Sequence, residues 1–427
     1  MELALFFIIF VVLLFINCPV AFSMLLCSFA FILLKDIPVL ILPERISAGL
    51  FSFPLLAMPF FILAARIMNS TGITGRIFNL CLTLVGHKRG GLAHVNVISS
   101  MIFSGISGSA MADVAGLGAV EIKAMKENGY DPGYTAAVTA ASCTIGPVVP
   151  PSMMMILIGV MMEESVGRLF AGGFIPGMVM GLSLIVLIYL QSFSKRFAFP
   201  QAKPRFSSSE FFKALKESYL ALLAPLIILG SILTGVATPT EAGIIAVLYS
   251  IFLGIIYKEL TFRNFFDVLK DAALQTGIIM FIVAAAQIFG WIVTTERVAT
   301  VAYNLVIQFV SSKWAILMII NIVLLAIGCL IEGLAAIMIT VPVLLPVMQK
   351  LGVDPTHFGV FLCINILIGL LTPPLGIAVY ISTDLAKVPV MEGFRKSALF
   401  LIPLLITLLL VTYIPEITLF IPNLFFK

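Results

Sequence analysis

The sequence predicts an all-α polytopic membrane protein made of two inverted repeats, each with a re-entrant helical hairpin and a broken helix. The first observation behind this fold class is composition. Of the 427 residues, 61% are hydrophobic and only 11% are charged, which excludes a soluble domain. Many windows of about 18–20 apolar residues can each span a bilayer. The second observation is that a set of Gly, Pro and Asp residues occurs twice at one fixed offset.

The repeated residues fix the shape of the backbone rather than fill space. At this constant offset, and without gaps, Gly129-x-Asp131-Pro132 matches Gly352-x-Asp354-Pro355, Gly146-x-x-x-Pro150-Pro151 matches Gly369-x-x-x-Pro373-Pro374, and Gly105 matches Gly328. Two copies of a backbone device within apolar sequence are typical of membrane transporters built from duplicated halves. We divide the chain into an N-terminal half, residues 1–198, a cytoplasmic linker, residues 199–217, and a C-terminal half, residues 218–427.

Helical segments can be assigned in order along the first half. We expect an apolar pair at residues 2–17 and 19–34, an amphipathic arm at 43–51, a span at 53–86 with a break at Ser70-Thr71-Gly72, a helix at 134–162 interrupted at Gly146–Pro151, and a span at 168–194. Residues 91–126 are too rich in Gly and Ser in the middle to form a plain span. They predict a re-entrant hairpin with its tip near Ser104–Ser109.

The second half repeats this order. We expect spans at 218–235 and 240–257, an arm at 261–272, a broken span at 275–310, a hairpin at 314–350 with its tip near Gly328–Gly333, a helix at 357–387 interrupted at Gly369–Pro374, and a last span at 393–420. The linker is identified by its basic residues and by the run Ser207-Ser208-Ser209.

The distribution of Lys and Arg supports the inverted arrangement. We assume an external N-terminus, five crossings in each half, and hairpins that return to their own side. The loops predicted to lie inside then contain 16 of the 25 Lys and Arg residues, namely Lys88, Arg89, Lys123, Lys126, Lys195, Arg196, Lys203, Arg205, Lys213, Lys216, Lys258, Arg263, Lys270, Lys387, Arg395 and Lys396. This is the positive-inside pattern. Because the number of crossings per half is odd, one hairpin is expected to enter from each side of the membrane.

The two Pro-Pro breaks are the strongest candidates for a functional site. Pro151 and Pro374 each lack a backbone donor and clash with the preceding turn. A helix broken in the membrane leaves unpaired carbonyls and amides, which is costly unless they line a cavity or hold an ion. Carbonyls at the end of one half-helix suit a small cation, and the amides that begin the next suit an anion. A kinked packing helix is the alternative, but two copies at one offset favour the functional interpretation.

The hairpin tips differ in chemistry. The first tip has three hydroxyls and two glycines within Ser104-Gly105-Ile106-Ser107-Gly108-Ser109. Hydroxyl and carbonyl oxygens are suitable ligands for Na⁺, whereas close helix packing through small residues is the alternative explanation. The second tip, Gly328-Cys329-Leu330-Ile331-Glu332-Gly333, has fewer hydroxyls but contains a carboxylate. Thr372, just before the second Pro-Pro pair, is expected to supply the missing oxygen.

Ionisable residues in apolar sequence are functional candidates because burying an unpaired charge is expensive. Four such residues are Arg66, Asp113, Glu332 and Asp384. For Arg66 and Asp384 we favour an interfacial position or an interhelical pair. Glu332, together with Asp113 and Ser152, is a candidate for contact with substrate. The polar side chains Asn96, Gln275, Gln287 and Asn365 are expected to hold helices together.

Other classes of site have weaker support. Gly105-Ile106-Ser107-Gly108 matches the Gly-x-Ser-Gly of rhomboid-like intramembrane serine proteases, but His357 is the one later histidine and lies in a loop-like sequence. A passive channel would not need two occluding hairpins. The six cysteines occur singly in apolar stretches and the three histidines are scattered, so no disulfide and no metal site other than Na⁺ is expected. No organic cofactor and no nucleic-acid partner are expected.

Several motifs together resemble the large membrane subunit of the tripartite ATP-independent periplasmic (TRAP) transporters. These motifs are Ser104-Gly105-Ile106-Ser107-Gly108-Ser109, Thr340-Val341-Pro342, Leu371-Thr372-Pro373-Pro374-Leu375-Gly376 and Ala386-Lys387-Val388-Pro389. The resemblance covers essentially the whole chain and leans toward members that transport sialic acid. It implies Na⁺-driven secondary import of an organic carboxylate, of the sialic-acid or C4-dicarboxylate type, across the bacterial inner membrane, and it implies that the chain is not an enzyme.

The resemblance also implies sites, partners and a mechanism. One Na⁺ site would involve Ser104, Ser107, Ser109, Gly146 and Pro150, and the other Gly328, Gly333, Thr372 and Pro373. The implied partners are a small four-helix membrane subunit on a separate chain, a periplasmic substrate-binding protein and membrane lipid. An elevator movement is implied, in which a transport domain, about 53–162 and 275–387, slides against a scaffold formed by the remainder. The alternative is a standalone divalent-anion/Na⁺ symporter that works without a binding protein.

Overall fold

The computed structural model describes residues 2–194, 199–200, 205–310 and 312–426, and in these residues helices are the one kind of regular secondary structure. Eight of the described helical segments are long and apolar enough to cross a membrane. The predicted all-α polytopic fold is therefore confirmed. Lys195, Arg196, Lys203 and part of the predicted linker lie outside the described residues.

The first half follows the predicted order of elements. Its helices are α1 (Glu2–Phe15), α2 (Val20–Leu34), α3 (Ile41–Leu50), η1 (Phe53–Leu56), α4 (Ala57–Ser70), α5 (Ile73–Val85), α6 (Gly91–Ser107), α7 (Ala110–Ala115), α8 (Leu117–Glu127), α9 (Pro132–Ser142), η2 (Cys143–Ile145), α10 (Met153–Met162) and α11 (Val166–Gln191). Helices α6 and α7–α8 are the two arms of the first hairpin. Helices α9 and α10 are the two parts of the first broken helix.

The second half contains α12 (Ser208–Leu233), α13 (Pro239–Ile256), α14 (Phe262–Thr295), α15 (Val298–Phe309), α16 (Lys313–Leu330), α17 (Gly333–Lys350), α18 (Pro355–Gly369), α19 (Ile377–Ala386), α20 (Val390–Tyr413) and α21 (Glu416–Phe425). Its broken helix begins at Pro355, the repeat equivalent of Pro132, where α9 begins. In both copies an Asp caps the helix, since Asp131 accepts from the Tyr134 amide and Asp354 from the Thr356 amide. The peptide bonds Pro150–Pro151 and Pro373–Pro374 are both cis.

Some element boundaries differ from the prediction. The predicted arm at 261–272 and the following span form the single helix α14, because no Gly or Pro interrupts residues 262–276, whereas Pro54 stands between α3 and α4 in the first half. The last predicted span is divided into α20 and α21 at Ile414–Pro415. Helix α12 begins at Ser208, with Ser207 as its N-cap, so the second part of the predicted linker is helical.

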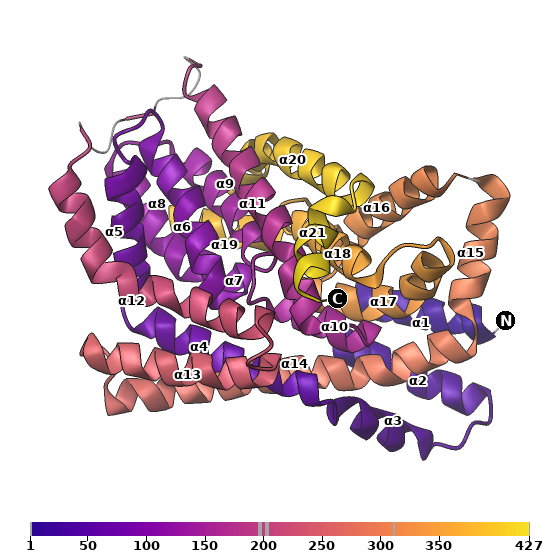
Figure 1. Ribbon diagram of the computed structural model, residues 1–427. Coiled ribbons are helices and arrows are strands. Elements are labelled where there is room, and N and C mark those ends of the chain that lie inside the picture. The colour runs from indigo at the N-terminus through magenta and orange to yellow at the C-terminus, as the bar shows by residue number, and fades with distance from the viewer. Residues whose placement is uncertain (1, 195–198, 201–204, 311, 427) are drawn as a thin grey trace.

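The two hairpins lie toward different ends of the molecule. Figure 1 shows α5, α6 and α8 at one end and α15 and α16 at the other, with the long helices α13 and α14 along one edge. Helix α14 packs against α2, and its repeat counterpart α4 packs against α13. The broken helices lie in the centre, where α10 packs against α17 and α19 packs against α9. Hairpin and break residues of both halves therefore meet in the interior.

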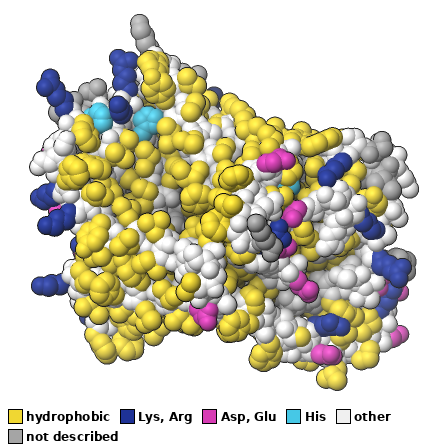
Figure 2. Space-filling model, viewed as in Figure 1, with side chains coloured by type: hydrophobic (Ala, Val, Ile, Leu, Met, Phe, Trp, Pro, Cys, Tyr) yellow, Lys and Arg dark blue, Asp and Glu magenta, His cyan; other side chains and the backbone are white. Residues whose placement is uncertain are grey.

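The surface carries apolar side chains over most of its area. Examples are Phe15, Phe51 and Phe262, which are 84%, 87% and 81% exposed, as lipid-facing side chains are. Figure 2 shows Lys and Arg at both ends, but at the end formed by α5 and α12 few Asp or Glu accompany them, whereas most visible Asp and Glu lie toward the opposite end. This distribution agrees with the positive-inside assignment of the first end to the cytoplasm.

If the halves are inverted, as the sequence predicts, two equivalent positions should show opposite accessibility. Glu127 ends the first hairpin and Lys350, its repeat equivalent, ends the second, and both side chains are exposed. After replacement of the six native cysteines, a cysteine at position 127 should react with a membrane-impermeant thiol reagent from the cytoplasm, and one at position 350 from the periplasm. Labelling of both from the same side would show that the repeats are parallel.

Candidate functional site: hairpin tips at two broken helices

The first hairpin tip is a tight turn that rests on the first broken helix. Helix α6 ends at Ser107, Gly108 has a φ of +59°, and Ser109 caps α7 by accepting from the Ala112 amide at 3.4 Å. A left-handed φ of this kind favours glycine. The Gly108 carbonyl accepts a hydrogen bond of 3.4 Å from the Met153 amide, the first residue of α10. The backbone of the tip is thus attached to the break.

The first break consists of buried, irregular backbone between α9 and α10. Ser152 caps α10 by accepting from the Met155 amide at 3.1 Å, and its hydroxyl donates to the Pro147 carbonyl. Gly146 leaves room for Asp113 of the hairpin, because a Cβ at position 146 would collide with the Asp113 carboxylate. Close approach of a carboxylate to a broken helix therefore depends on glycine at this position.

Asp113 provides a carboxyl group with one unpartnered oxygen at this contact. The carboxylate is 2% exposed, and its Oδ1 accepts from the Ser107 hydroxyl. Its Oδ2 is buried and has no hydrogen-bond partner among the described residues. A buried carboxylate oxygen without a partner is costly, and a cation at this point would remove the cost. The donor set, a carboxylate and a hydroxyl beside a broken helix, fits a hard cation such as Na⁺.

The predicted residues of the first Na⁺ site lie near one another, but only some of them contact the Asp113 carboxyl group. Ser107 and Gly146 both contact Asp113. Ser109 caps α7, and Ser104 donates to the Ser100 carbonyl of its own helix. The Pro150 carbonyl oxygen lies 3.6 Å from where a Cβ would stand at Gly105. Asp113, which we assigned to substrate, thus lies with the Na⁺ candidates.

The second hairpin tip meets the second break in a similar way but with different chemistry. The Leu375 amide donates to the Cys329 carbonyl at 3.2 Å, and Gly328 packs against the Gly369 backbone. The Thr372 hydroxyl lies 2.9 Å from the Gly369 carbonyl and 2.7 Å from the Cys329 thiol. The repeat equivalent of Asp113 in this half is an alanine, Ala336. The second site therefore offers a hydroxyl and carbonyl oxygens without an equivalent carboxylate.

Of the remaining two predicted residues of the second site, Gly333 lies away from this contact and Pro373 lies beside it in the break. Gly333 starts α17 and faces Met154 of the first half. Pro373 follows Thr372 within the break, and its peptide bond to Pro374 is cis.

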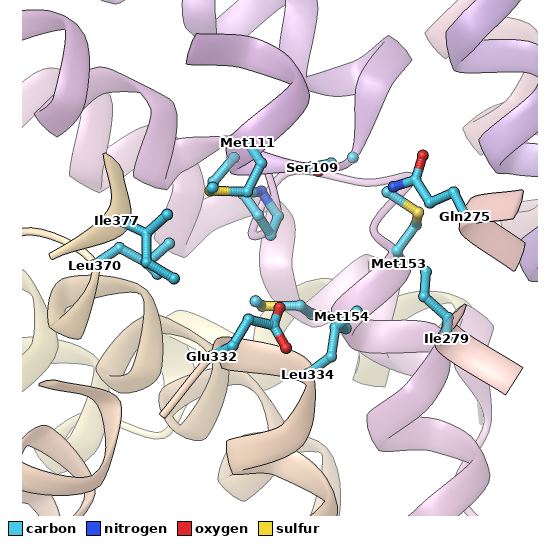
Figure 3. A pocket seen from close by; sticks show the side chains of 14 residues that line it. Ser109, Met111, Met153, Met154, Gln275, Ile279, Glu332, Leu334, Leu370 and Ile377 are labelled. Atoms are coloured by element: carbon cyan, nitrogen blue, oxygen red, sulfur yellow. The ribbon is translucent and has the colours of Figure 1, made fainter. Parts of the chain in front are cut away.

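A cavity of about 110 Å³ lies between the two tips and the two breaks. Its lining comes from both hairpins, both breaks and α14: Gly108, Ser109, Ala110, Met111, Pro147, Met153, Met154, Gln275, Ile279, Glu332, Gly333, Leu334, Leu370 and Ile377. Figure 3 shows Glu332 and Gln275 on different walls, with Met153 and Met154 between them. Of the three substrate candidates, Glu332 lines this cavity, whereas Asp113 and Ser152 do not.

Sequence reasoning did not identify two polar features of the site. Gln275, which we expected to hold helices together, lines the cavity. Glu121, which is fully buried, accepts from the Ser99 hydroxyl at 2.5 Å across the hairpin, while its Oε2 has no partner among the described residues. The two arms of a hairpin bring together residues from before and after its tip. Ser99 and Glu121 are polar residues on opposite arms, and that placement was a usable signal.

The geometry does not support the serine-protease interpretation. Ser107 hydrogen-bonds Asp113 rather than a histidine. His357 Nε2 contacts the Val411 carbonyl at 2.9 Å. The histidine that the protease interpretation requires is therefore engaged elsewhere and does not activate Ser107 as a nucleophilic serine needs.

Comparisons with known proteins agree with a transporter. Residues 7–417 match the family described as "Tripartite ATP-independent periplasmic transporter, DctM component". The chain is 41% identical to the sialic acid TRAP transporter large permease protein SiaM of Vibrio cholerae, covering 97% of this chain and 96% of the relative. It is 36% identical to the C4-dicarboxylate TRAP transporter large permease protein DctM of Pseudomonas aeruginosa, covering 87% and 86%. These relatives are named as permeases, not enzymes.

Two further comparisons concern chain length and fold. The sialic acid TRAP transporter permease protein SiaT of Haemophilus influenzae is 38% identical, and the alignment covers 97% of this chain but 67% of the relative. The solved YdaH transporter of Alcanivorax borkumensis has the same general fold at 12% identity, with a TM-score of 0.61 and coverage of 87% and 86%. The chain therefore belongs to the DctM family of tripartite ATP-independent periplasmic transporters and is a multi-pass protein of the inner membrane.

Proposed function

We propose that this chain imports an organic carboxylate, of the sialic-acid or C4-dicarboxylate type, coupled to Na⁺ and by an elevator movement. One observation carries the proposal. Each hairpin tip is attached to the broken helix of its own half, and both tips line one cavity. Such a cavity suits a solute that is held between two ion-dependent gates.

Na⁺ coupling is supported by the chemistry of the first tip. The hydrogen bond between Ser107 and Asp113 closes the turn around Gly108. Ser109, which follows Gly108, lines the cavity. A cation held by Asp113 would hold the tip against Gly146 and so keep the cavity wall in place. The affinity for substrate would then depend on the cation, which is the thermodynamic requirement for coupling.

The substrate class is supported by the names of the relatives. Besides sialic acid and C4-dicarboxylates, 2,3-diketo-L-gulonate is named for YiaN of Escherichia coli, which is 35% identical over 404 residues. All three are carboxylates, whereas isethionate, named for the 37% identical DctMQ of Oleidesulfovibrio alaskensis, is a sulfonate. The sialic-acid relatives SiaM and SiaT have the higher identities, 41% and 38%, so N-acetylneuraminate is the first compound to test.

The proposed partners are a periplasmic binding protein and a small four-helix membrane subunit on a separate chain. Membership of a tripartite family supports the existence of both. The description of SiaM as a large permease protein supports a separate small subunit, whereas SiaT extends well beyond the part that this chain matches. These observations favour the tripartite arrangement over the standalone symporter.

Contacts within the structure support a moving body that contains both hairpins. Helix α11 packs against α6, α10 and α18, and α20 packs against α9, α18 and α19. The transport domain predicted from sequence, 53–162 and 275–387, remains a proposal, and these contacts favour adding α11 and α20 to it. The scaffold would then consist mainly of α1–α3, α12 and α13, with α4 and α14 at the boundary.

Uptake in proteoliposomes tests the function. The chain, the small subunit and the binding protein should together take up N-acetylneuraminate or succinate when a Na⁺ gradient is imposed, and uptake should stop when K⁺ replaces Na⁺ at equal ionic strength. Omission of the binding protein should abolish uptake. Unchanged uptake driven by a proton gradient alone would contradict Na⁺ coupling, and saturable uptake by this chain alone would favour the standalone symporter.

A further inference from the structure

An arginine and a glutamine from different halves form a pair beside the cavity. Arg66 of α4 donates from Nη2 and Nε to Gln275 Oε1 of α14, at 2.9 and 3.2 Å. The interhelical pair that we favoured for Arg66 is therefore present. Gln275 lines both the cavity between the tips and a larger adjoining cavity of about 520 Å³ that extends between α14 and α2. Gln275 thus stands at the boundary of two neighbouring cavities, with Arg66 behind it.

The charge of Arg66 is not neutralised within the described part of the chain. Its side chain is exposed, it lies within the apolar helix α4, and no carboxylate of the described residues forms an ion pair with it. Arginine stays protonated in proteins. A cation at membrane depth is rare and faces a water-filled cavity or an anion rather than lipid. Arg66 is not among the lining residues of either cavity and reaches them through Gln275, so its positive charge is available to attract an anion that enters them.

The arginine also fixes the orientation of the glutamine amide. A guanidinium group donates hydrogen bonds and accepts none, so the atom of Gln275 that faces it must be the carbonyl oxygen. The amide nitrogen Nε2 must then point the other way. Figure 3 shows the Gln275 nitrogen on the side of Met153 and the cavity, with the oxygen directed away. Gln275 thus presents two N–H donors to the cavity, and Arg66 polarises them.

We propose that Arg66 and Gln275 form the subsite for the carboxylate of the transported solute, an inference that rests on the proposed function. Gln275 Nε2 donates directly to the carboxylate, while Arg66 supplies positive charge and holds the amide in place. Glu332 lies on another wall of the same cavity and accepts from the Ala335 amide at 3.4 Å. The Glu332 carboxyl group accepts hydrogen bonds, so it suits the hydroxyl or amide groups at the other end of the solute.

Anion binding to the purified membrane complex, the chain with its small subunit, tests this subsite. Thermal unfolding is followed in Na⁺ with increasing N-acetylneuraminate or its methyl ester, and with succinate or its dimethyl ester. In the wild type, each acid should stabilise at concentrations at least about tenfold lower than its ester. Arg66→Gln should weaken binding of the acids by about tenfold to a hundredfold and leave binding of the esters unchanged, because the positive charge beside the carboxylate and the group that orients the Gln275 amide are both lost. Arg66→Lys should keep part of the preference, since it keeps the charge but loses the planar fork.

Gln275→Glu separates recognition from structure. A glutamate at this position forms an ion pair with Arg66, so the unliganded protein should unfold at the wild-type temperature or above it. The same change neutralises Arg66 and places a negative charge at the subsite, so the preference for acids should disappear. If Arg66 and Gln275 only hold α4 and α14 together, Gln275→Glu would keep the wild-type preference, and that result would overturn the inference.

The matched control is Arg45→Gln. Arg45 of α3 is also exposed and stacks over the Trp291 ring at 5.5 Å, away from the cavity lining. The Arg45→Gln variant should bind both the acids and the esters as the wild type does. If it lost the preference for acids as strongly as Arg66→Gln does, the subsite would be overturned. A wild-type complex that neither binds nor takes up any carboxylate would instead contradict the proposed function. Wild-type anion preference in Arg66→Gln would overturn the subsite alone.

Discussion

Asp113→Asn should abolish the Na⁺ dependence of substrate uptake. The carboxylate is almost fully buried, is held at Oδ1 by Ser107, and faces Gly146 with an oxygen that has no partner among the described residues. An amide keeps the shape of the side chain but removes the negative charge that balances the cation. Loss of one member of a buried charge pair costs about 3–5 kcal/mol, or more than about a hundredfold in apparent Na⁺ affinity. The measurement is the Na⁺ concentration that gives half-maximal uptake, or half-maximal thermal stabilisation without substrate.

Two further variants test this prediction, one with a smaller expected loss of Na⁺ affinity and one that serves as a control. Ser107→Ala removes one oxygen with little change in volume, so its loss of Na⁺ affinity should be smaller, about tenfold to a hundredfold. Asp384→Asn removes a carboxylate that pairs with Lys387 at the surface, where both side chains are largely exposed, and it should leave the Na⁺ response unchanged. A wild-type Na⁺ response in Asp113→Asn would show that this carboxylate is a packing group and that the ion site lies elsewhere.

The order of helices could be predicted because its signals are local. Apolar length, Gly-rich tips and the Pro-Pro pairs are each visible within a short window of sequence, and they placed both hairpins and both breaks. The continuity of α14 was missed for a local reason as well. The arm in the first half is separated from its span by Pro54, and we carried that separation over to a stretch without a helix breaker.

The cavity could not be predicted in the same way because its walls come from distant parts of the chain. Gln275 and Glu332 belong to different elements of the second half, and Ser109 belongs to the first half. Sequence periodicity shows that a position is polar within an apolar helix but not which hollow its helix borders. Gln275 therefore looked like any interhelical amide, and its role depends on Arg66, a residue far away in the sequence. The contact of Asp113 with Gly146 likewise depends on how the hairpin is seated on the break.

Gly369→Ala should disable the second site by separating the hairpin from the broken helix. Gly369 ends α18, and a Cβ at this position would overlap the backbone of Gly328 in α16, which a rotamer change cannot relieve. Inserting a methyl group into a closely packed contact costs about 1–3 kcal/mol, more than the gain in helix propensity from Gly to Ala. Because Thr372 contacts both the Gly369 carbonyl and the Cys329 thiol, the displacement should also disturb the second set of oxygen ligands. We expect a lower unfolding temperature and strongly reduced uptake.

Gly230→Ala in α12 is the matched control, since nothing lies within 4 Å of the added Cβ, and it should leave both measurements at or slightly above the wild-type values. Wild-type stability and uptake in Gly369→Ala would mean that the second hairpin does not rest against its broken helix through these two glycines.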